Sequence, residues 1–370
     1  MSTAPFGARL ERVRERMAEL GVGVLGLSVG PDLPWLSGYE AMPLERLTML
    51  VVPADDDATL VVPGLEASRV TEHPELFAIR PWSETEDPID IVAGLVGPSA
   101  TLALGDRTWA RFVIDLHRRL PGVELRRAID VVGPLRAVKD DHEIAALRRA
   151  SAAVDRIAAD LQAGRIPLVG RTEAEVSADL GRRIIDEGHQ RVNFAIVATG
   201  ANAASPHHEA DGTVIAEGDV VLCDFGGTMH DEFGVGYCSD ITRCVWTGEP
   251  TARAREVYDV LFAAQAAGVA AGVVGVTCES VDAAARVVIA DAGYGEWFIH
   301  RTGHGIGVEE HEDPYMVSGN RETLAAGHAY SVEPGIYLPG ELGFRLEDIV
   351  VATTDGPDPL NRVDHHLASV

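Results

Sequence analysis

Five residues after position 220 have the types and spacing of a metal site: Asp224, Asp240, His304, Glu333 and Glu347. Asp224 follows an apolar run at 220–223, and Glu347 lies between Leu346 and the apolar residues 349–351. A carboxylate in such a setting is costly unless it is paired or coordinates a cation. The set therefore indicates bound cations rather than a solvated acidic surface.

The surroundings of the other members fit this chemistry. Glu333 precedes Pro334-Gly335, a turn signal that predicts a position at a strand end. His304 has a glycine on each side, which allows the backbone to approach a centre closely. Strand alternation predicts that Arg345 and Glu347 share one face and one pocket.

The donor types restrict the metal. Carboxylate oxygens with one imidazole suit Mn²⁺, Co²⁺, Fe²⁺ or Zn²⁺. Four acids exceed what one catalytic zinc uses, so we expect two bridged divalent ions. Each residue alone has a simpler interpretation, since an isolated strand aspartate usually caps or lies on an edge and an isolated histidine in a glycine loop is usually structural. The combination favours metal binding.

Three motifs also carry a family resemblance: TGHGIG at 302–307, SVEPGIY at 331–337 and FRLEDIV at 344–350. In order and spacing they resemble metallopeptidase family M24, the pita-bread fold of Xaa-Pro dipeptidases (prolidases), aminopeptidase P and methionine aminopeptidases. The resemblance covers about residues 135–370. The preceding segment resembles, more weakly, the N-terminal domain of creatinase and prolidases. The implied fold is α+β, with an N-terminal α/β domain over 1–135 and a pita-bread catalytic domain over 136–370.

The resemblance implies roles for individual residues. Asp224 and Glu347 would bridge two metals, with Asp240 on one metal and His304 and Glu333 on the other. Manganese is the metal expected first, with cobalt, iron or zinc as alternatives. A substrate-side pair would be His207 and His311, and His208 remains open as a rival to His207.

The sequence departs from the family pattern at two places. A longer stretch than is common, residues 228–237, separates the two aspartates; it predicts an enlarged hairpin loop and leaves Asp231 as a competitor of Asp240. Tyr315 stands where some prolidases carry an arginine for the C-terminal carboxylate of the substrate. This second departure weakens the expectation of strict dipeptidase activity.

The activity implied by the resemblance is hydrolysis of the bond before proline, in dipeptides first. A hydroxide bridging the two metals would attack the carbonyl, and Glu333 would pass the proton to the leaving amine. His207, His311 and Arg345 would hold the substrate or stabilise the oxyanion.

Several other functions compete with this one. An aminopeptidase P-type exopeptidase and a metal-dependent lyase or other small-molecule enzyme on the same fold are the alternatives. Creatinase-like enzymes and non-enzymatic binding modules tend to lose ligands, so five retained positions count against both. A serine hydrolase is disfavoured because the sequence has no GxSxG elbow.

Periodicity predicts the elements that must position these residues. In the first segment we expect helices at 8–20 and 108–120 and strands at 22–27, 47–52, 59–62, 77–80 and 101–104, with a hairpin turn at Asp55–Asp57. In the second, capping boxes at Asp140/Glu143 and Thr172/Glu175 begin two helices. Two more helices are expected at 251–271 and 279–292, and strands at 194–198, 219–223, 329–333 and 344–351.

Composition narrows the partners. The 370 residues are 46% hydrophobic and carry a formal charge of −26, which disfavours nucleic acid and anionic membranes as partners. No apolar run approaches a membrane span, and residues 1–20 lack the apolar core of a signal peptide. The four cysteines form no CxxC pair, which favours a reduced, cytoplasmic protein. The family resemblance adds the expectation of a homodimer.

Overall fold

The computed structural model describes residues 5–370 and divides into two compact units. The first unit comprises the chain up to Arg136 together with Asp231–Gly236. The second comprises Ala137–His230 and Tyr237–Val370. Within residues 5–370, no helix is long and apolar enough to cross a membrane.

The first unit is built on a six-stranded mixed sheet with the strand order β4-β3-β2-β1-β5-β6. Its strands are β1 Val24–Leu27, β2 Met49–Pro53, β3 Ala58–Pro63, β4 Phe77–Trp82, β5 Thr101–Leu104 and β6 Glu124–Arg127. Its helices are α1 Phe6–Leu20, α2 Asp32–Ser37, α3 Pro88–Val96, α4 Ala110–Arg119 and α5 Ile129–Ala137, of which the last crosses into the second unit, with a 3₁₀ turn η1 at Ala67–Arg69.

The core of this unit lies between the sheet and the α3–α4 pair. Met49 and Val51 on β2 pack with Val92 on α3 and Leu116 on α4, all fully buried. β2 and β3 pair antiparallel around residues 54–57, which confirms the predicted hairpin. The predicted helices at 8–20 and 108–120 are also present as α1 and α4.

Four helices belong to the second unit: α6 Asp141–Gln162, α7 Glu173–Asp186, α8 Ala252–Ala271 and α9 Cys278–Asp291. Both predicted capping boxes are formed: Asp140 with Glu143 begins α6, and Thr172 with Glu175 begins α7. Each box satisfies two backbone N–H groups that a helix start would otherwise leave without a partner. The sequence alone therefore located where both helices begin.

Three sheets complete the second unit. Their strands are β7 Arg191–Thr199, β8 Val220–His230, β9 Gly236–Cys238, β10 Thr242–Trp246, β11 Gly303–Gly305, β12 Glu312–Met316, β13 Ala329–Val332, β14 Gly335–Leu338, β15 Leu342–Arg345, β16 Asp348–Thr353, β17 Gly356–Pro359 and β18 Ala368–Ser369, with 3₁₀ turns η2 Gly200–Ala204 and η3 Gly295–Trp297. One sheet runs β18-β10-β8-β7 with β9 beside β8, the second runs β12-β11-β13-β16-β17, and β14 and β15 form a hairpin.

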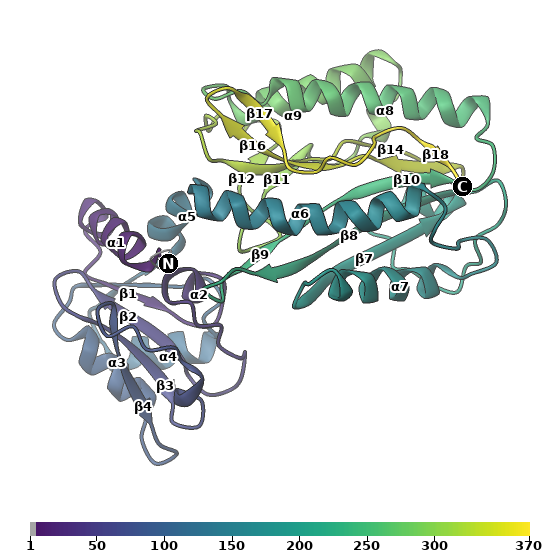
Figure 1. Cartoon of the computed structure of the whole chain (residues 1–370). Coiled ribbons are helices and arrows are strands. Elements are labelled where there is room, and N and C mark those ends of the chain that lie inside the picture. Colours follow the sequence, from purple (N-terminus) through teal and green to yellow (C-terminus); the bar gives the residue numbers. More distant parts are fainter. Residues whose placement is uncertain (1–4) are drawn as a thin grey trace. The chain divides into compact units, whose positions relative to one another are not determined.

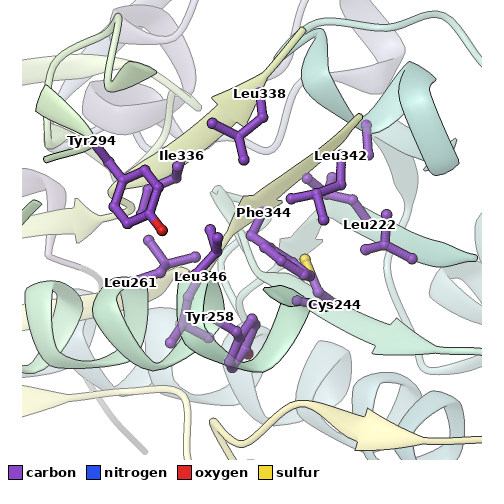
Figure 2. Close-up of a cluster of buried hydrophobic side chains, with 14 of the residues drawn as sticks. Leu222, Cys244, Tyr258, Leu261, Tyr294, Ile336, Leu338, Leu342, Phe344 and Leu346 are labelled. Atoms are coloured by element: carbon purple, nitrogen blue, oxygen red, sulfur yellow. The ribbon is translucent and has the colours of Figure 1, made fainter. Parts of the chain in front are cut away.

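The sheets of this unit lie between two helix pairs, with α8 and α9 outside one sheet and α6 and α7 outside the other (Figure 1). Each half begins with two helices and continues into strands, an α+β arrangement. In the core beneath the β14–β15 hairpin, Phe344 and Leu346 meet Tyr258 and Leu261 of α8 (Figure 2). The ring of Phe344 packs edge-on against Tyr258, with centroids 5.2 Å apart.

The structure corrects three sequence-based predictions of local structure. The strand expected at 344–351 is broken at Leu346–Glu347, because β15 pairs with β14 whereas β16 pairs with β13. The stretch 228–237 is only partly a loop, since β8 continues to His230 before the tip. His304 lies in the short strand β11, not in a glycine loop.

Candidate metal centre

The second unit brings the five predicted ligands to one place, each from a different segment. Asp224 lies within β8, Asp240 in the connection between β9 and β10, and His304 at the centre of β11. Glu333 directly follows β13, and Glu347 occupies the break between β15 and β16. Ligand atoms of Asp240, His304 and Glu347 all lie within 4.8 Å of one another. All five line one cavity of about 460 Å³.

Arg345 and Thr242 hold two of the carboxylates. Arg345 donates from Nη2 to Asp224 Oδ2 over 2.5 Å and from Nε to the Thr242 hydroxyl over 3.2 Å. That hydroxyl donates in turn to Glu347 Oε2 over 2.7 Å. Since one oxygen of each carboxylate is fixed by a protein donor, the orientation of the other oxygen follows.

The hydrogen bonds of His304 determine its tautomer. Its Nδ1 lies 3.1 Å from the carbonyl oxygen of Gly305, so Nδ1 carries the proton and donates. In the neutral imidazole the Nε2 lone pair then faces Glu333 Oε1 at 3.2 Å and Asp240 Oδ2 at 3.8 Å. That contact is repulsive unless a proton or a metal ion lies between the nitrogen and the oxygens.

The five predicted ligands are called the cage below. Its four acids have too few positive charges near them to balance their own. Burial raises the pKa of Asp224 despite the charge of Arg345. Burial, and then the neighbouring carboxylates, raise the pKa of Asp240 and of Glu347 well above the ordinary range. Burial opposes ionisation of Glu333 too, but in the metal-free site a protonated His304, by its hydrogen bond and its charge, lowers the pKa of Glu333 to about 2.

Two buried carboxylate oxygens also lack a partner that would balance their charge. Among residues 5–370, Asp224 Oδ1 and Asp240 Oδ1 find no hydrogen-bond partner. A buried acceptor left unpaired costs about 1–3 kcal/mol. Hard oxygen donors and one imidazole around such atoms are the ligand set that divalent first-row metals take. The residues present therefore fit bound metal ions.

The predicted substrate-side residues His207, His311 and Arg345 also line the cavity. The ring of His311 lies 3.9 Å from that of His304, centroid to centroid. Burial, followed by the charges of His304 and Arg301, lowers the pKa of His311 to about 4, so its imidazole is neutral at pH 7. A neutral imidazole can either donate or accept a hydrogen bond there.

The rivals left open by the sequence lie elsewhere. His208 does not line the cavity; its Nε2 lies 2.7 Å from Glu173 Oε2. Asp231 belongs to the first unit, where its carboxylate accepts from the backbone N–H groups of Phe233 and Val235. Tyr315 does not line the cavity but lies beneath the guanidinium of Arg301, which does.

Sequence reasoning missed three polar residues around the cage. His300 and Arg301 line the cavity, and Tyr337 joins them from β14. His300 Nδ1 lies 2.7 Å from the Arg301 carbonyl oxygen, so its Nε2 accepts from the Tyr337 hydroxyl over 2.8 Å. That hydroxyl accepts in turn from Arg345 Nη1 over 2.9 Å. The available signal was that His300 and Arg301 directly precede the 302–307 motif and that Tyr337 ends the 331–337 motif.

Comparison with protein families gives a match over most of the chain. The model described as metallopeptidase family M24 matches residues 144–354, more than half of the sequence. The chain belongs to metallopeptidase family M24. The creatinase/prolidase N-terminal domain matches residues 9–138. The predicted combination of an N-terminal creatinase/prolidase-like domain with a pita-bread domain is confirmed, and the protein is a metallopeptidase, a hydrolase of a family that uses divalent metals.

Individual relatives are similar to this M24 chain along nearly its whole length. A probable dipeptidase PepE of Mycobacterium bovis is 43% identical over 370 residues, covering 99% of this chain and 96% of the relative. An Xaa-Pro dipeptidase of Lactobacillus delbrueckii subsp. lactis is 33% identical over 368 residues, covering 97% and 98%. The crystal structure of a prolidase from Thermococcus sibiricus matches with a TM-score of 0.91 and 31% identity, covering 100% of both chains.

Proposed function

We propose that this metallopeptidase hydrolyses the bond before proline, with dipeptides as its first substrates, at a centre ligated by Asp224, Asp240, His304, Glu333 and Glu347. The observation that carries the ligand set is the pair of buried, unpartnered oxygens, Asp224 Oδ1 and Asp240 Oδ1, inside a cage of four acids and one histidine. The substrate class is supported by relatives named Xaa-Pro dipeptidase and prolidase.

Two divalent ions bound in this cage would lower the pKa of a water toward neutrality and polarise the scissile carbonyl. The residues that would hold the ions are Asp224, Asp240, His304, Glu333 and Glu347. Manganese is the metal proposed first, because oxygen donors dominate the set, with cobalt, iron and zinc as alternatives.

Glu333 is proposed as the proton carrier. Its Oε1 lies 3.2 Å from His304 Nε2 at the wall of the cavity, where the carboxylate can accept a proton. Its Oε1 also accepts from the Ser331 hydroxyl over 3.0 Å, which fixes the carboxylate at the end of β13. The proton it accepts would pass to the leaving imide nitrogen, which has no hydrogen of its own before cleavage.

The remaining lining residues are proposed to hold the substrate. His207 and His311 would donate to the oxygen that gains charge during attack, and Arg345 would keep Asp224 oriented. Phe194 and Ile196 form an apolar part of the cavity wall that suits a pyrrolidine ring. A tertiary amide offers no N–H, so selection for proline would depend on shape.

The test is the Glu333→Gln variant measured on a panel of Xaa-Pro dipeptides, matched dipeptides without proline, and Xaa-Pro-Yaa tripeptides. We expect kcat on Xaa-Pro dipeptides to fall by about 10²–10⁴-fold, the usual contribution of a positioned acid–base group. Glu341→Gln, at an exposed position between β14 and β15, is the matched control. Metal content is measured on the same samples.

Near wild-type hydrolysis by Glu333→Gln with metal bound would contradict the proposed role. Faster cleavage of tripeptides than of dipeptides by the wild type would favour an aminopeptidase P-type enzyme, an alternative supported by the tyrosine at position 315. Bound metal without peptide turnover would favour a lyase or another small-molecule reaction, and failure to bind metal would favour a binding module.

We also propose a reducing, cytoplasmic location and a homodimer. The first is supported by four cysteines, Cys223, Cys238, Cys244 and Cys278, which are all buried free thiols. The second rests on the family resemblance alone and is tested by light scattering of the purified protein.

A further inference from the structure

Outside the cage, a fully buried carboxylate stands at the start of α7. Glu173 is the first residue of this helix and has no exposed surface. Its Oε1 accepts from the backbone N–H of Thr199 over 2.7 Å and from Asn202 Nδ2 over 3.1 Å. Its Oε2 lies 2.7 Å from His208 Nε2 and 3.3 Å from the backbone nitrogen of Asp211. One carboxylate thus joins four points of the segment 199–211.

The backbone of α7 holds the end of the same segment. The N–H of Glu173 donates to the carbonyl oxygen of Thr213, and that of Ala174 donates to Asp211, each over 3.0 Å. The N-terminus of a helix also favours a negative charge. The segment 199–211 is therefore fixed at both ends by the first turn of α7.

This segment carries two groups that reach the metal cage. His207 lines the cavity, and the carbonyl oxygen of Pro206 accepts from Arg345 Nη1 over 3.2 Å. Arg345 in turn holds Asp224. His208, next along the chain, is bound to Glu173, so the two adjacent histidines have separate tasks.

We propose that Glu173 is a positioning residue, which clamps the segment 199–211 through His208 so that His207 faces the substrate. This inference rests on the proposed function for its kinetic consequence. Glu173, His208 and Asp211 could also be grouped as metal ligands. However, both oxygens of Glu173 already accept from protein donors, which favours a clamp over a further metal site.

The test is a double-mutant cycle of Glu173→Gln and His207→Ala. The amide of the first variant keeps one acceptor for Thr199 and Asn202 but turns a donor toward His208 and Asp211. We expect kcat/KM for an Xaa-Pro dipeptide to fall on the order of tenfold to hundredfold, as for a catalytic group displaced by about 1 Å. In the His207→Ala background the same change should have little further effect, since Glu173 acts through His207.

Glu175→Gln is the matched control, because Glu175 lies in the same first turn of α7 and closes the capping box without bonding the segment 199–211. It should leave kcat/KM unchanged. An equal loss from Glu173→Gln in both backgrounds, or the same loss from Glu175→Gln, would overturn the proposal. So would a drop in metal content of Glu173→Gln, which would point to a metal site at the cluster.

Hydrogen–deuterium exchange provides a readout that does not depend on activity. The amide of Asp211, which donates to Glu173 Oε2, should exchange faster in Glu173→Gln and remain protected in Glu175→Gln. If the wild type fails to cleave Xaa-Pro bonds but this amide responds as expected, the substrate assignment fails while the clamp stands. Unchanged exchange in Glu173→Gln would overturn the clamp itself.

Discussion

At the scale of single residues, the guanidinium of Arg345 connects the metal cage to the structure around it. It donates to Asp224, the hydroxyls of Thr242 and Tyr337, and the Pro206 carbonyl oxygen. Burial would lower its pKa, but Tyr337, Asp224 and Glu333 together raise it well above the ordinary value. A permanent planar cation is thus required here, because an ammonium group cannot reproduce four directed bonds.

We therefore predict that Arg345→Lys lowers kcat/KM for Xaa-Pro dipeptides by on the order of a hundredfold and also lowers the melting temperature. The lysine would leave buried acceptors without donors. Steady-state kinetics and thermal melts with bound metal measure both effects. Arg148→Lys, a partly exposed arginine paired with Asp358, is the control and should change neither. Wild-type kinetics of Arg345→Lys would refute the positioning role of the guanidinium.

At the scale of elements, the β14–β15 hairpin fixes where Arg345 and Glu347 stand. The hairpin is covered on one side by η2, and a Cβ at Gly343 would lie 1.8 Å from the carbonyl oxygen of Ala203. No side chain fits at that distance, so glycine allows the two backbones to touch. The contact connects the strand that carries Arg345 with the segment that carries His207.

For this reason Gly343→Ala should be destabilising, by about 1–3 kcal/mol, the usual cost of overpacking. It should also reduce kcat/KM, because β15 and η2 must separate and both carry groups of the site. Urea denaturation and dipeptide kinetics provide the two measurements. Gly94→Ala in α3 is the control, since an added Cβ there meets nothing within 4 Å and alanine favours a helix. Equal behaviour of the two variants would exclude the close approach as the cause.

At the scale of the whole molecule, the five proposed ligands lie in or next to strands of different sheets of the second unit. Asp224 and Asp240 lie in or next to the sheet of β8 and β10, His304 and Glu333 lie in or next to that of β11 and β13, and Glu347 lies between β15 and β16. The chain as a whole carries a formal charge of −26, so the four acids of the cage add to a negative charge that the molecule already has in excess. Metal binding should stabilise the fold by linking these sheets and by neutralising the acids between them.

The pH dependence of the metal-free protein follows from Asp240. Burial raises its pKa in the folded state, so the native protein holds this proton more tightly than the unfolded chain. Its stabilising contribution is full below the unfolded pKa of about 3.9 and is lost as the pH rises toward the folded value. An asparagine cannot ionise and avoids this loss.

We predict that, in a chelator, Asp240→Asn is more stable than the wild type at pH 7, by on the order of 1–3 kcal/mol, and that the difference disappears near pH 4. With saturating Mn²⁺ the order should reverse, because the wild type gains more from binding. Urea unfolding at several pH values measures both. Glu341→Gln, at an exposed turn, is the control. A variant less stable than the wild type at pH 7 without metal would contradict the prediction.

The sequence by itself indicated the proposed ligands and located many of the elements. Capping boxes at α6 and α7, the β2–β3 hairpin and the M24 motifs are local patterns, which depend on residues a few positions apart. Asp224 and Glu333 could be singled out because an acid beside an apolar strand needs a partner wherever that strand packs.

Only the tertiary structure decided the remaining questions, because they depend on contacts between distant segments. It separated His207 from His208 through Glu173, which lies more than thirty residues earlier in the chain. It assigned Asp231 to a hairpin tip and broke the strand at Glu347, where the chain passes from one sheet to another. Hydrogen-bond partners and the sheet to which a strand belongs are properties of packing, which no local pattern encodes.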